Sequence, residues 1–278
     1  MLSTVARYIP KPIKPPIEFV FFALADLVDA LPGNRNTLTP PSYLREYIGD
    51  GDFEETGKQF LKHHIELANL RPDESVLDVG CGIGRMAAGL CNYLNDKGTY
   101  NGFDVVKRGI IWCNRHIARK HPNFRFAHSD VFNKAFNARG KIKAAEYKFS
   151  YPDDSFDYVF AYSVFTHMTG NDLENYLKEV ARVLKPQGRC LITYFLLNTE
   201  SYDSIKRRTS SIDFKPYSKE SWSLSVGTPE FAIAYDETFV TYLYSKYGLQ
   251  IQHPVHFGSW SNRSGSLDFQ DIVVAVKE

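Results

Sequence analysis

Short apolar runs alternate with amphipathic segments through the middle of the chain. The runs predict β-strands at 75–79, 99–103, 124–127, 156–162 and 188–195. Apolar positions at helical spacing predict helices at 57–70, 85–94, 106–120 and 172–184. This alternation is typical of an α/β fold, in which helices cover both faces of a parallel sheet.

The C-terminal part of the chain has a different pattern. A long polar segment at 198–236, rich in Ser, Tyr and Lys, precedes an expected helix at 237–247. Two strand-like runs, LQIQHPVHFGSW and DFQDIVVAVKE, then flank the Gly/Ser turn SNRSGS. We expect these two runs to form an antiparallel hairpin that closes one edge of the sheet.

Residues 1–55 form a lead-in to one domain at 56–278, which has insertions at about 133–154 and 198–236. The apolar stretch at 17–31 contains three acidic residues, so it is too short and too charged to span a bilayer. Its apolar residues recur at helical spacing, which predicts an amphipathic helix. We expect this helix to pack on the domain or a partner subunit; the alternative is contact with a membrane surface.

Charge and cysteine content argue against some classes of partner and site. The chain has 278 residues and a net charge of +1, which gives no electrostatic case for a nucleic-acid partner because phosphate binding usually shows as a basic excess. The four cysteines form no CxxC pair and no His/Cys cluster with zinc-like spacing. We therefore expect reduced thiols, no metal and a cytoplasmic enzyme.

The stretch VLDVGCGIGR ends the first predicted strand and opens a helix. Glycine permits positive φ and lets a ligand approach the main chain, where a Cβ would intrude. In open α/β sheets, ligands bind beyond the carboxyl ends of the strands. A dinucleotide fingerprint needs a third glycine where Arg85 stands, and a phosphate loop needs Gly-Lys-Ser/Thr, which is absent here. Both of those ligand classes are therefore disfavoured.

Acidic residues follow the next two strands. Asp104 ends the second strand, where a carboxylate can accept from both hydroxyls of a ribose. Asp130 follows the third strand, where a carboxylate can accept from the exocyclic amine of an adenine. The alternatives are an ordinary loop acid at Asp104 and a loop or helix-capping acid at Asp130. Taken together, the three strand ends describe a site for an adenosine with a tail that is not a phosphate.

From about 57 to 196 the sequence resembles the class I S-adenosylmethionine-dependent methyltransferases, especially their small-molecule branch. The resemblance is carried by VLDVGCGIGR, GFDVV, HSDVF, FDYVFAYSVFTHM and YLKEVARVLKPQGRCLITYF. It implies a Rossmann-like, mostly parallel seven-stranded sheet whose last strand is antiparallel. It also implies S-adenosyl-L-methionine as the cofactor.

The resemblance further implies which residues bind the cofactor. They are Asp78, Gly80, Cys81, Gly82, Gly84, Asp104, Val105, Asp130, Val131, Tyr162 and Ser163. The three glycines would line the methionine portion, and Asp78 would act through the turn or on the amino group. Asp104 would hold the ribose hydroxyls, and Asp130 and Val131 would face the adenine. Tyr162 and Ser163 would lie near the sulfonium.

His167 lies a few residues beyond the fourth strand and is the candidate general base. The alternative is that it caps or packs at the start of the next helix. His253 and His256 are secondary candidates. The two insertions could wall a substrate pocket, with lid or surface aromatics at Tyr202, Tyr217, Trp222 and Tyr235.

The sequence therefore predicts an enzyme that methylates a small molecule, a sugar or a lipid-linked intermediate. A nicotinamide-dependent oxidoreductase remains a second hypothesis, against which Arg85 argues. A third hypothesis is a non-catalytic module that binds S-adenosylmethionine.

Overall fold

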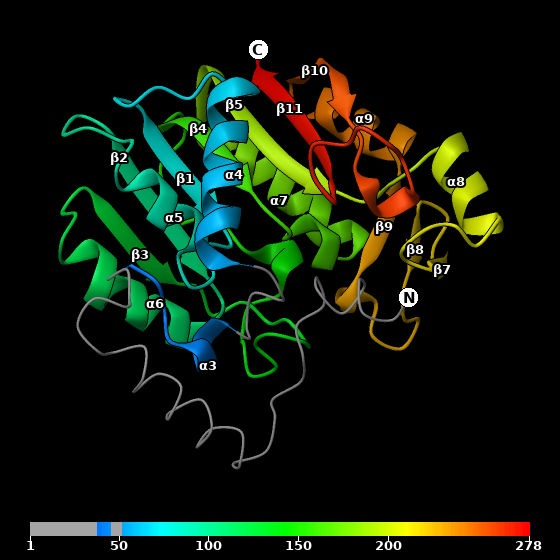
Figure 1. The fold of residues 1–278 in the computed structure, drawn as a ribbon, viewed down its shortest axis with the longest axis horizontal. Helices are drawn as coiled ribbons and strands as arrows, with labels where there is room; N and C mark the ends of the chain where they lie inside the picture. The colour runs from blue at the N-terminus through cyan, green and yellow to red at the C-terminus, as the bar shows by residue number, and fades with distance from the viewer. Residues whose placement is uncertain (1–37, 46–51) are drawn as a thin grey trace.

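The computed structural model describes residues 38–45 and 52–278, and a seven-stranded sheet forms its centre (Figure 1). The strands are β1 (Ser75–Val79), β2 (Thr99–Asp104), β3 (Phe124–His128), β4 (Phe156–Ala161), β5 (Leu184–Tyr194), β10 (Leu249–His256) and β11 (Asp271–Lys277). Their order is β10-β11-β5-β4-β1-β2-β3. Only β11 runs opposite to the other six strands, so the expected mostly parallel sheet with its antiparallel C-terminal hairpin is confirmed.

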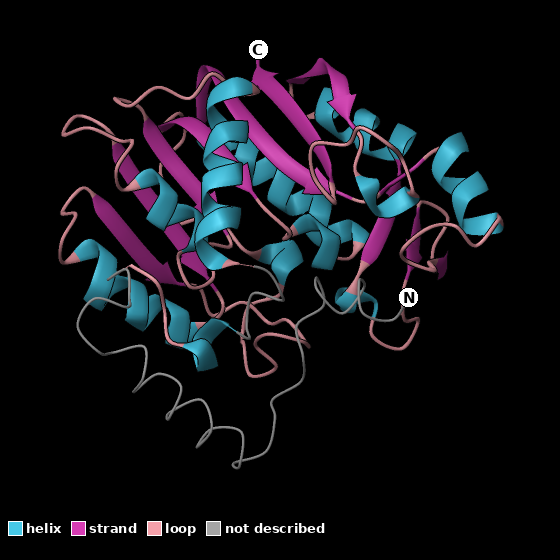
Figure 2. Cartoon of the chain, in the orientation of Figure 1, coloured by secondary structure: helices cyan, strands magenta, loops and turns pink. Residues whose placement is uncertain are grey.

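Helices cover both faces of this sheet (Figure 2). One face packs against α4 (Phe53–Glu66), α5 (Arg85–Leu90) and α6 (Lys107–Cys113), which continues as the π-helix η2 (Asn114–Ala118). The other face packs against α7 (Gly170–Val183) and α9 (Glu237–Lys246). The alternation of side chains along β1 explains both layers, because Val76 joins the first core and Leu77 and Val79 join the second.

Helix boundaries differ from the expected ones where capping decides them. The helix expected at 57–70 begins at Phe53, because the Asp52 carboxylate accepts a hydrogen bond from the Glu55 amide at 2.7 Å. The helix α7 begins after Thr169, whose side chain forms a capping box with Asp172. Two other elements differ in length, since α5 ends at Leu90 and β5 follows α7 directly at Leu184.

The polar segment at 198–236 contains structure that the sequence pattern did not predict. It contains α8 (Thr199–Lys206) and most of a second sheet, of order β6-β9-β8-β7. Its strands are β6 (Leu196–Leu197), β7 (Lys215–Pro216), β8 (Ser221–Ser223) and β9 (Ile233–Asp236). The Asp271 carboxylate ties this sheet to the main one, because it accepts from the Leu196 amide at 2.6 Å and from the Trp260 indole at 2.8 Å.

Before α4, the structure describes only residues 38–45 and Asp52. The amphipathic helix expected at 17–31 lies outside the described residues. A short helix, α3 (Ser42–Arg45), precedes α4. Within 38–45 and 52–278, no helix is long and apolar enough to cross a membrane. All four cysteines are free and buried.

Candidate functional site

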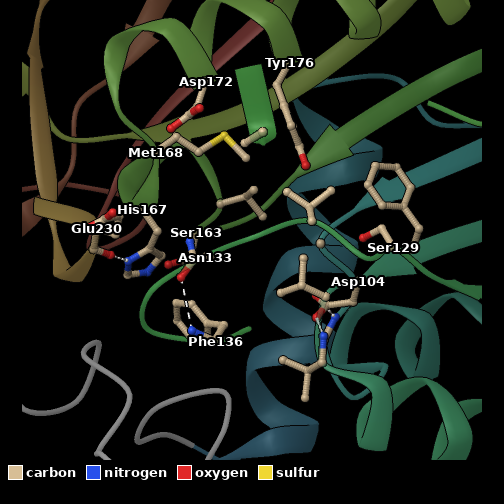
Figure 3. A pocket seen from close by; sticks show the side chains of 18 of the residues that line it. Asp104, Ser129, Asn133, Phe136, Ser163, His167, Met168, Asp172, Tyr176 and Glu230 are labelled. Atoms are coloured by element: carbon tan, nitrogen blue, oxygen red, sulfur yellow. Dashed lines mark hydrogen bonds between the residues drawn. The ribbon is translucent and has the colours of Figure 1, made fainter. Parts of the chain in front are cut away.

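A cavity of about 490 Å³ opens at the carboxyl ends of β1, β2 and β4 (Figure 3). Parallel strands end at the same edge of a sheet, so this position is the expected one for a ligand. Ten of the residues expected from the sequence line it: Asp78, Gly80, Cys81, Gly82, Asp104, Val105, Val131, Tyr162, Ser163 and His167. Figure 3 shows Asp104 and Ser129 on one side of the cavity, and His167 and Glu230 on the other.

The glycine turn brings bare main chain to the cavity. Gly80 has a φ of 81° and Gly82 a φ of 56°, which only glycine adopts readily. The carbonyl of Phe103 accepts hydrogen bonds from the amides of Gly80 at 2.9 Å and Cys81 at 3.1 Å, so β2 holds the turn. A Cβ on Gly80 would lie 2.3 Å from the Val164 side chain. The turn therefore fits closely against the loop after β4.

Gly84 serves a different purpose from the other two glycines. It does not belong to the residues that line the cavity. A Cβ on Gly84, whose φ is 80°, would lie 2.7 Å from Ile117 Cδ1 and 2.9 Å from Cys113 Sγ. Gly84 thus allows the start of α5 to pack against the α6 and η2 helix, and its position gives no support to the expected ligand contact.

Asp104 is buried and held rigidly at the end of β2. Its Oδ2 accepts from the Gly82 amide at 2.8 Å, and its Oδ1 accepts from the Val106 amide at 2.6 Å. Each carboxylate oxygen has a further lone pair, so two vicinal hydroxyls could still be bound. Burial raises the pKa of Asp104, while the backbone donors and His128 oppose that rise.

Asp78 lines the cavity on the strand next to Asp104. The Tyr100 hydroxyl donates to its Oδ2 at 2.5 Å. Burial raises the pKa of Asp78 to about 8, the hydrogen bond from Tyr100 lowers it, and the charge of Asp104 raises it. Burial also raises the pKa of the neighbouring Cys81 thiol, so this cysteine stays protonated and is a poor nucleophile.

Residues 129 to 131, directly after β3, present alternate residues to the cavity. Ser129 and Val131 line it, whereas Asp130 between them does not. Successive side chains of extended chain point in opposite directions, which accounts for the difference. The Asp130 carbonyl instead accepts from the amides of Lys141 at 2.9 Å and Ile142 at 3.0 Å. The main chain of Asp130 therefore holds the first insertion in place. The position of Asp130 does not support the expected contact of its carboxylate with adenine.

His167 ends the 3-10 helix η4 (Phe165–His167) and lines the cavity. Its Nδ1 lies 2.8 Å from the Glu230 carbonyl. A carbonyl can only accept, so Nδ1 carries the proton and the neutral ring keeps a lone pair on Nε2. Burial lowers the pKa of His167, against the opposing effect of the Glu230 and Phe231 carbonyls. The helix cap that follows is Thr169, not His167.

Both insertions contribute to the site. The first contributes Asn133, Phe136, Lys143, Ala144 and Ala145 to the lining, next to Phe132, which directly precedes it. The second contributes Glu230, on the 3-10 helix η5 (Pro229–Phe231), while none of its four candidate lid aromatics lines the cavity. Glu230 Oε2 is buried and has no hydrogen-bond partner among the described residues. Nothing in the sequence marked Glu230, because its position depends on contacts with distant segments.

The remaining candidates lie elsewhere. His253 and His256 are on β10, at the edge of the sheet, and neither lines the cavity. In the described part of the chain, no group of three or more His, Cys, Asp or Glu side chains is placed to hold a metal ion.

Comparisons with known proteins agree with this geometry. Residues 76–188 match the family model described as a methyltransferase domain. The sterol 4-C-methyltransferase strm-1 of Caenorhabditis elegans is 28% identical over 185 residues, which cover 66% of this chain and 48% of that protein. Phosphoethanolamine N-methyltransferase 1 of Arabidopsis thaliana is 28% identical over 173 residues, which cover 62% and 30%. The chain thus spans less than half the length of these two curated relatives.

Solved structures share the fold. A SAM-dependent methyltransferase from Methanosarcina mazei superposes with a TM-score of 0.52 at 21% identity, covering 76% of this chain and 96% of that one. The magnesium protoporphyrin IX methyltransferase of Synechocystis, solved with bound S-adenosylhomocysteine, gives a TM-score of 0.51 at 15% identity, covering 83% and 90%.

Proposed function

We propose that this chain, which belongs through residues 76–188 to the class I S-adenosylmethionine-dependent methyltransferases, transfers a methyl group from that cofactor to a small molecule. One observation carries the proposal. A single cavity joins the glycine turn and Asp104, which suit an adenosine derivative, to the imidazole of His167, which suits proton removal. A nicotinamide-dependent oxidoreductase has no comparable support, since the relatives found are methyltransferases.

The cofactor-binding half of the cavity fits S-adenosylmethionine. The unused lone pairs of Asp104 would accept from the two ribose hydroxyls. The bare turn at Gly80 and Gly82 would lie along the methionine portion, and Asp78 would receive its ammonium group. Val105, Val131 and the neighbouring Ser129 would flank the adenine, while Tyr162 and Ser163 would lie near the sulfur.

The bound cofactor supplies a methyl group on a positively charged sulfur, which is a good leaving group. The protein therefore has to position the nucleophile and exclude water. His167 faces the cavity from beyond β4 with a lone pair on Nε2, and its lowered pKa keeps the ring neutral at pH 7. We assign to Nε2 the removal of a proton from a hydroxyl or thiol acceptor.

The acceptor half of the cavity combines apolar and polar side chains. Phe136 lies edge-on to His167 with ring centroids 5.4 Å apart, and Asn133, Asp172 and Glu230 add polar groups. This lining suits a small molecule, a sugar or the head of a lipid-linked intermediate. The two curated relatives are named for sterols and for phosphoethanolamine, and both classes belong in an acceptor screen. The four free cysteines support a cytoplasmic location.

Turnover with labelled cofactor tests the proposal. The full chain is incubated with S-adenosylmethionine carrying a ¹³C methyl group and with fractionated cell metabolites, and the products are followed by NMR and mass spectrometry. We expect label in a small molecule together with S-adenosylhomocysteine. Cofactor binding without transfer to any fraction would favour the non-catalytic module, and a change in NADH fluorescence on mixing would favour the oxidoreductase.

A further inference from the structure

The first insertion concentrates positive charge at the mouth of the cavity. Within the first insertion, residues 133–148 contain five cations and a single acid, Glu146, which gives this segment a net charge of +4 in a chain whose net charge is +1. The two acids at the end of the insertion, Asp153 and Asp154, pair with Arg182 and Lys277 outside it. The cations are Lys134, Arg139, Lys141, Lys143 and Lys148, all of them exposed. Lys143 pairs with Glu146 at 3.1 Å, which leaves four cations that no acid within the segment offsets.

Large apolar side chains are exposed among these cations. Phe132 is 43% exposed and Ile142 is 39% exposed, and the Phe132 amide donates to the Ile142 carbonyl at 2.7 Å. Val226, on the second insertion, is 60% exposed. The Lys134 ammonium donates to the carbonyl of the next residue, Gly227, at 3.1 Å, which joins the two insertions. We call this surface the mouth patch: Phe132, Lys134, Arg139, Lys141, Ile142, Lys143 and Val226.

The mouth patch borders the opening of the cavity. Phe132 and Lys143 both line the cavity and are exposed to solvent, so the patch continues from the cavity wall onto the surface. Anything that the patch binds would therefore lie next to the entrance for the acceptor.

A surface on which exposed apolar side chains alternate with Lys and Arg suits an anionic lipid surface. The apolar groups enter the boundary between headgroups and acyl chains, and the cations contact the negatively charged headgroups. Each Lys or Arg at such a surface strengthens binding by about fivefold. Three separated apolar side chains are few for a protein interface, whose core excludes charged residues.

We propose that the mouth patch docks this protein on an anionic lipid surface, so that the acceptor enters the cavity from that surface. The docking is inferred from the cations and exposed apolar side chains of the mouth patch alone. Only the entry of the acceptor rests on the proposed function.

Vesicle sedimentation tests the docking. The full chain is mixed with phosphatidylcholine vesicles, either pure or containing roughly one third phosphatidylserine. We expect binding only to the anionic vesicles, weakened by salt. Arg139→Gln/Lys141→Gln/Ile142→Ser alters exposed positions that do not line the cavity, and should weaken binding at least about tenfold. The matched control, Lys206→Gln/Arg207→Gln/Arg208→Gln, removes three exposed cations outside the patch and should change binding less than about twofold.

Three results would overturn the docking: no binding to anionic vesicles, equal loss in both triple variants, or binding to heparin but not to vesicles. The last would assign the patch to an acidic macromolecule. Val226→Ser, on the other insertion, provides an independent variant if the first does not fold. The assay needs neither cofactor nor turnover, so its failure is distinguishable from failure of the proposed methyl transfer.

Discussion

In the proposed function, cofactor binding depends most directly on Asp104, which lines the cavity. Its two oxygens are already oriented by the Gly82 and Val106 amides, so little ordering is needed when hydroxyls arrive. We expect Asp104→Ala to weaken S-adenosylmethionine binding by about 1–3 kcal/mol, measured by calorimetric titration. Asp130→Ala is the matched control, because it removes an acid next to the cavity that does not line it. Equal affinity in the two variants would contradict the ribose assignment.

In the proposed function, His167 is the residue that removes the proton from the acceptor. We expect His167→Ala to lower kcat by roughly a hundredfold for a hydroxyl or thiol acceptor, while cofactor affinity stays nearly constant. Burial lowers its pKa from 6.5, so the wild-type kcat should fall only as the pH drops below that value. Initial rates as a function of pH check both points. A variant with the wild-type rate would show that His167 is not the base.

Asp78 makes stability depend on pH in the cofactor-free protein. Its pKa rises from 3.8 to about 8 on folding, so the folded state keeps a proton that the unfolded state releases between these values. This contribution to stability is complete at low pH and is lost as the pH rises toward 8. Asp78→Asn has no such proton, so its free energy of unfolding relative to wild type should increase from about pH 5 to about pH 8. Urea unfolding at the two pH values tests this, and a constant difference would refute it.

At the scale of elements, the close packing between β1 and β2 requires a glycine at position 102. Gly102 pairs with Asp78 in the sheet register, and a Cβ on it would lie 2.9 Å from the Tyr100 hydroxyl and 2.8 Å from Cys81 Cβ. The missing side chain leaves the space through which Tyr100 reaches Asp78. We expect Gly102→Ala to cost about 1–3 kcal/mol, read from thermal unfolding. Gly170→Ala, where a Cβ meets nothing within 4 Å, should be close to neutral, and a larger loss there would contradict the packing argument.

The long elements of the main sheet could be predicted because each has a strong local pattern. β1 is apolar except for Ser75 and Asp78 and is buried on both faces, and the five parallel strands and the final hairpin lie where the sequence predicts them. The second sheet could not be predicted, because its strands are two to four residues long. Its core is completed by Phe195 and Trp260, which lie outside the segment that forms it. Such long-range packing leaves no periodic signal.

The residues of the candidate site also differ in whether the sequence could predict them. The glycine turn, Asp104 and His167 lie at or just beyond strand ends, so chain position alone brings them to one edge of the sheet. Gly84 and Asp130 are next to lining residues in the sequence but do not line the cavity themselves. Adjacent residues of an extended strand or a turn face different directions, so a sequence motif locates the cavity wall only to within one residue. Phe136 and Glu230 come from the two insertions, whose contact through Lys134 and the Gly227 carbonyl joins segments far apart in the sequence.

At the scale of the whole molecule, the shared family region and the site nearly coincide. Residues 76–188 include every residue that lines the cavity except Glu230. The half of the cavity that we propose binds the cofactor therefore lies wholly within the region that matches the family model. The insertions wall the acceptor half and surround its mouth, so they are the segments to vary in a search for substrate specificity.

Titration of the full chain with S-adenosylmethionine in a calorimeter tests the central claim, namely that this cavity holds a nucleoside carrying a charged sulfur. We expect saturation at one ligand per chain, unchanged by an excess of NADH. Absence of heat, or displacement of the ligand by NADH, would contradict it.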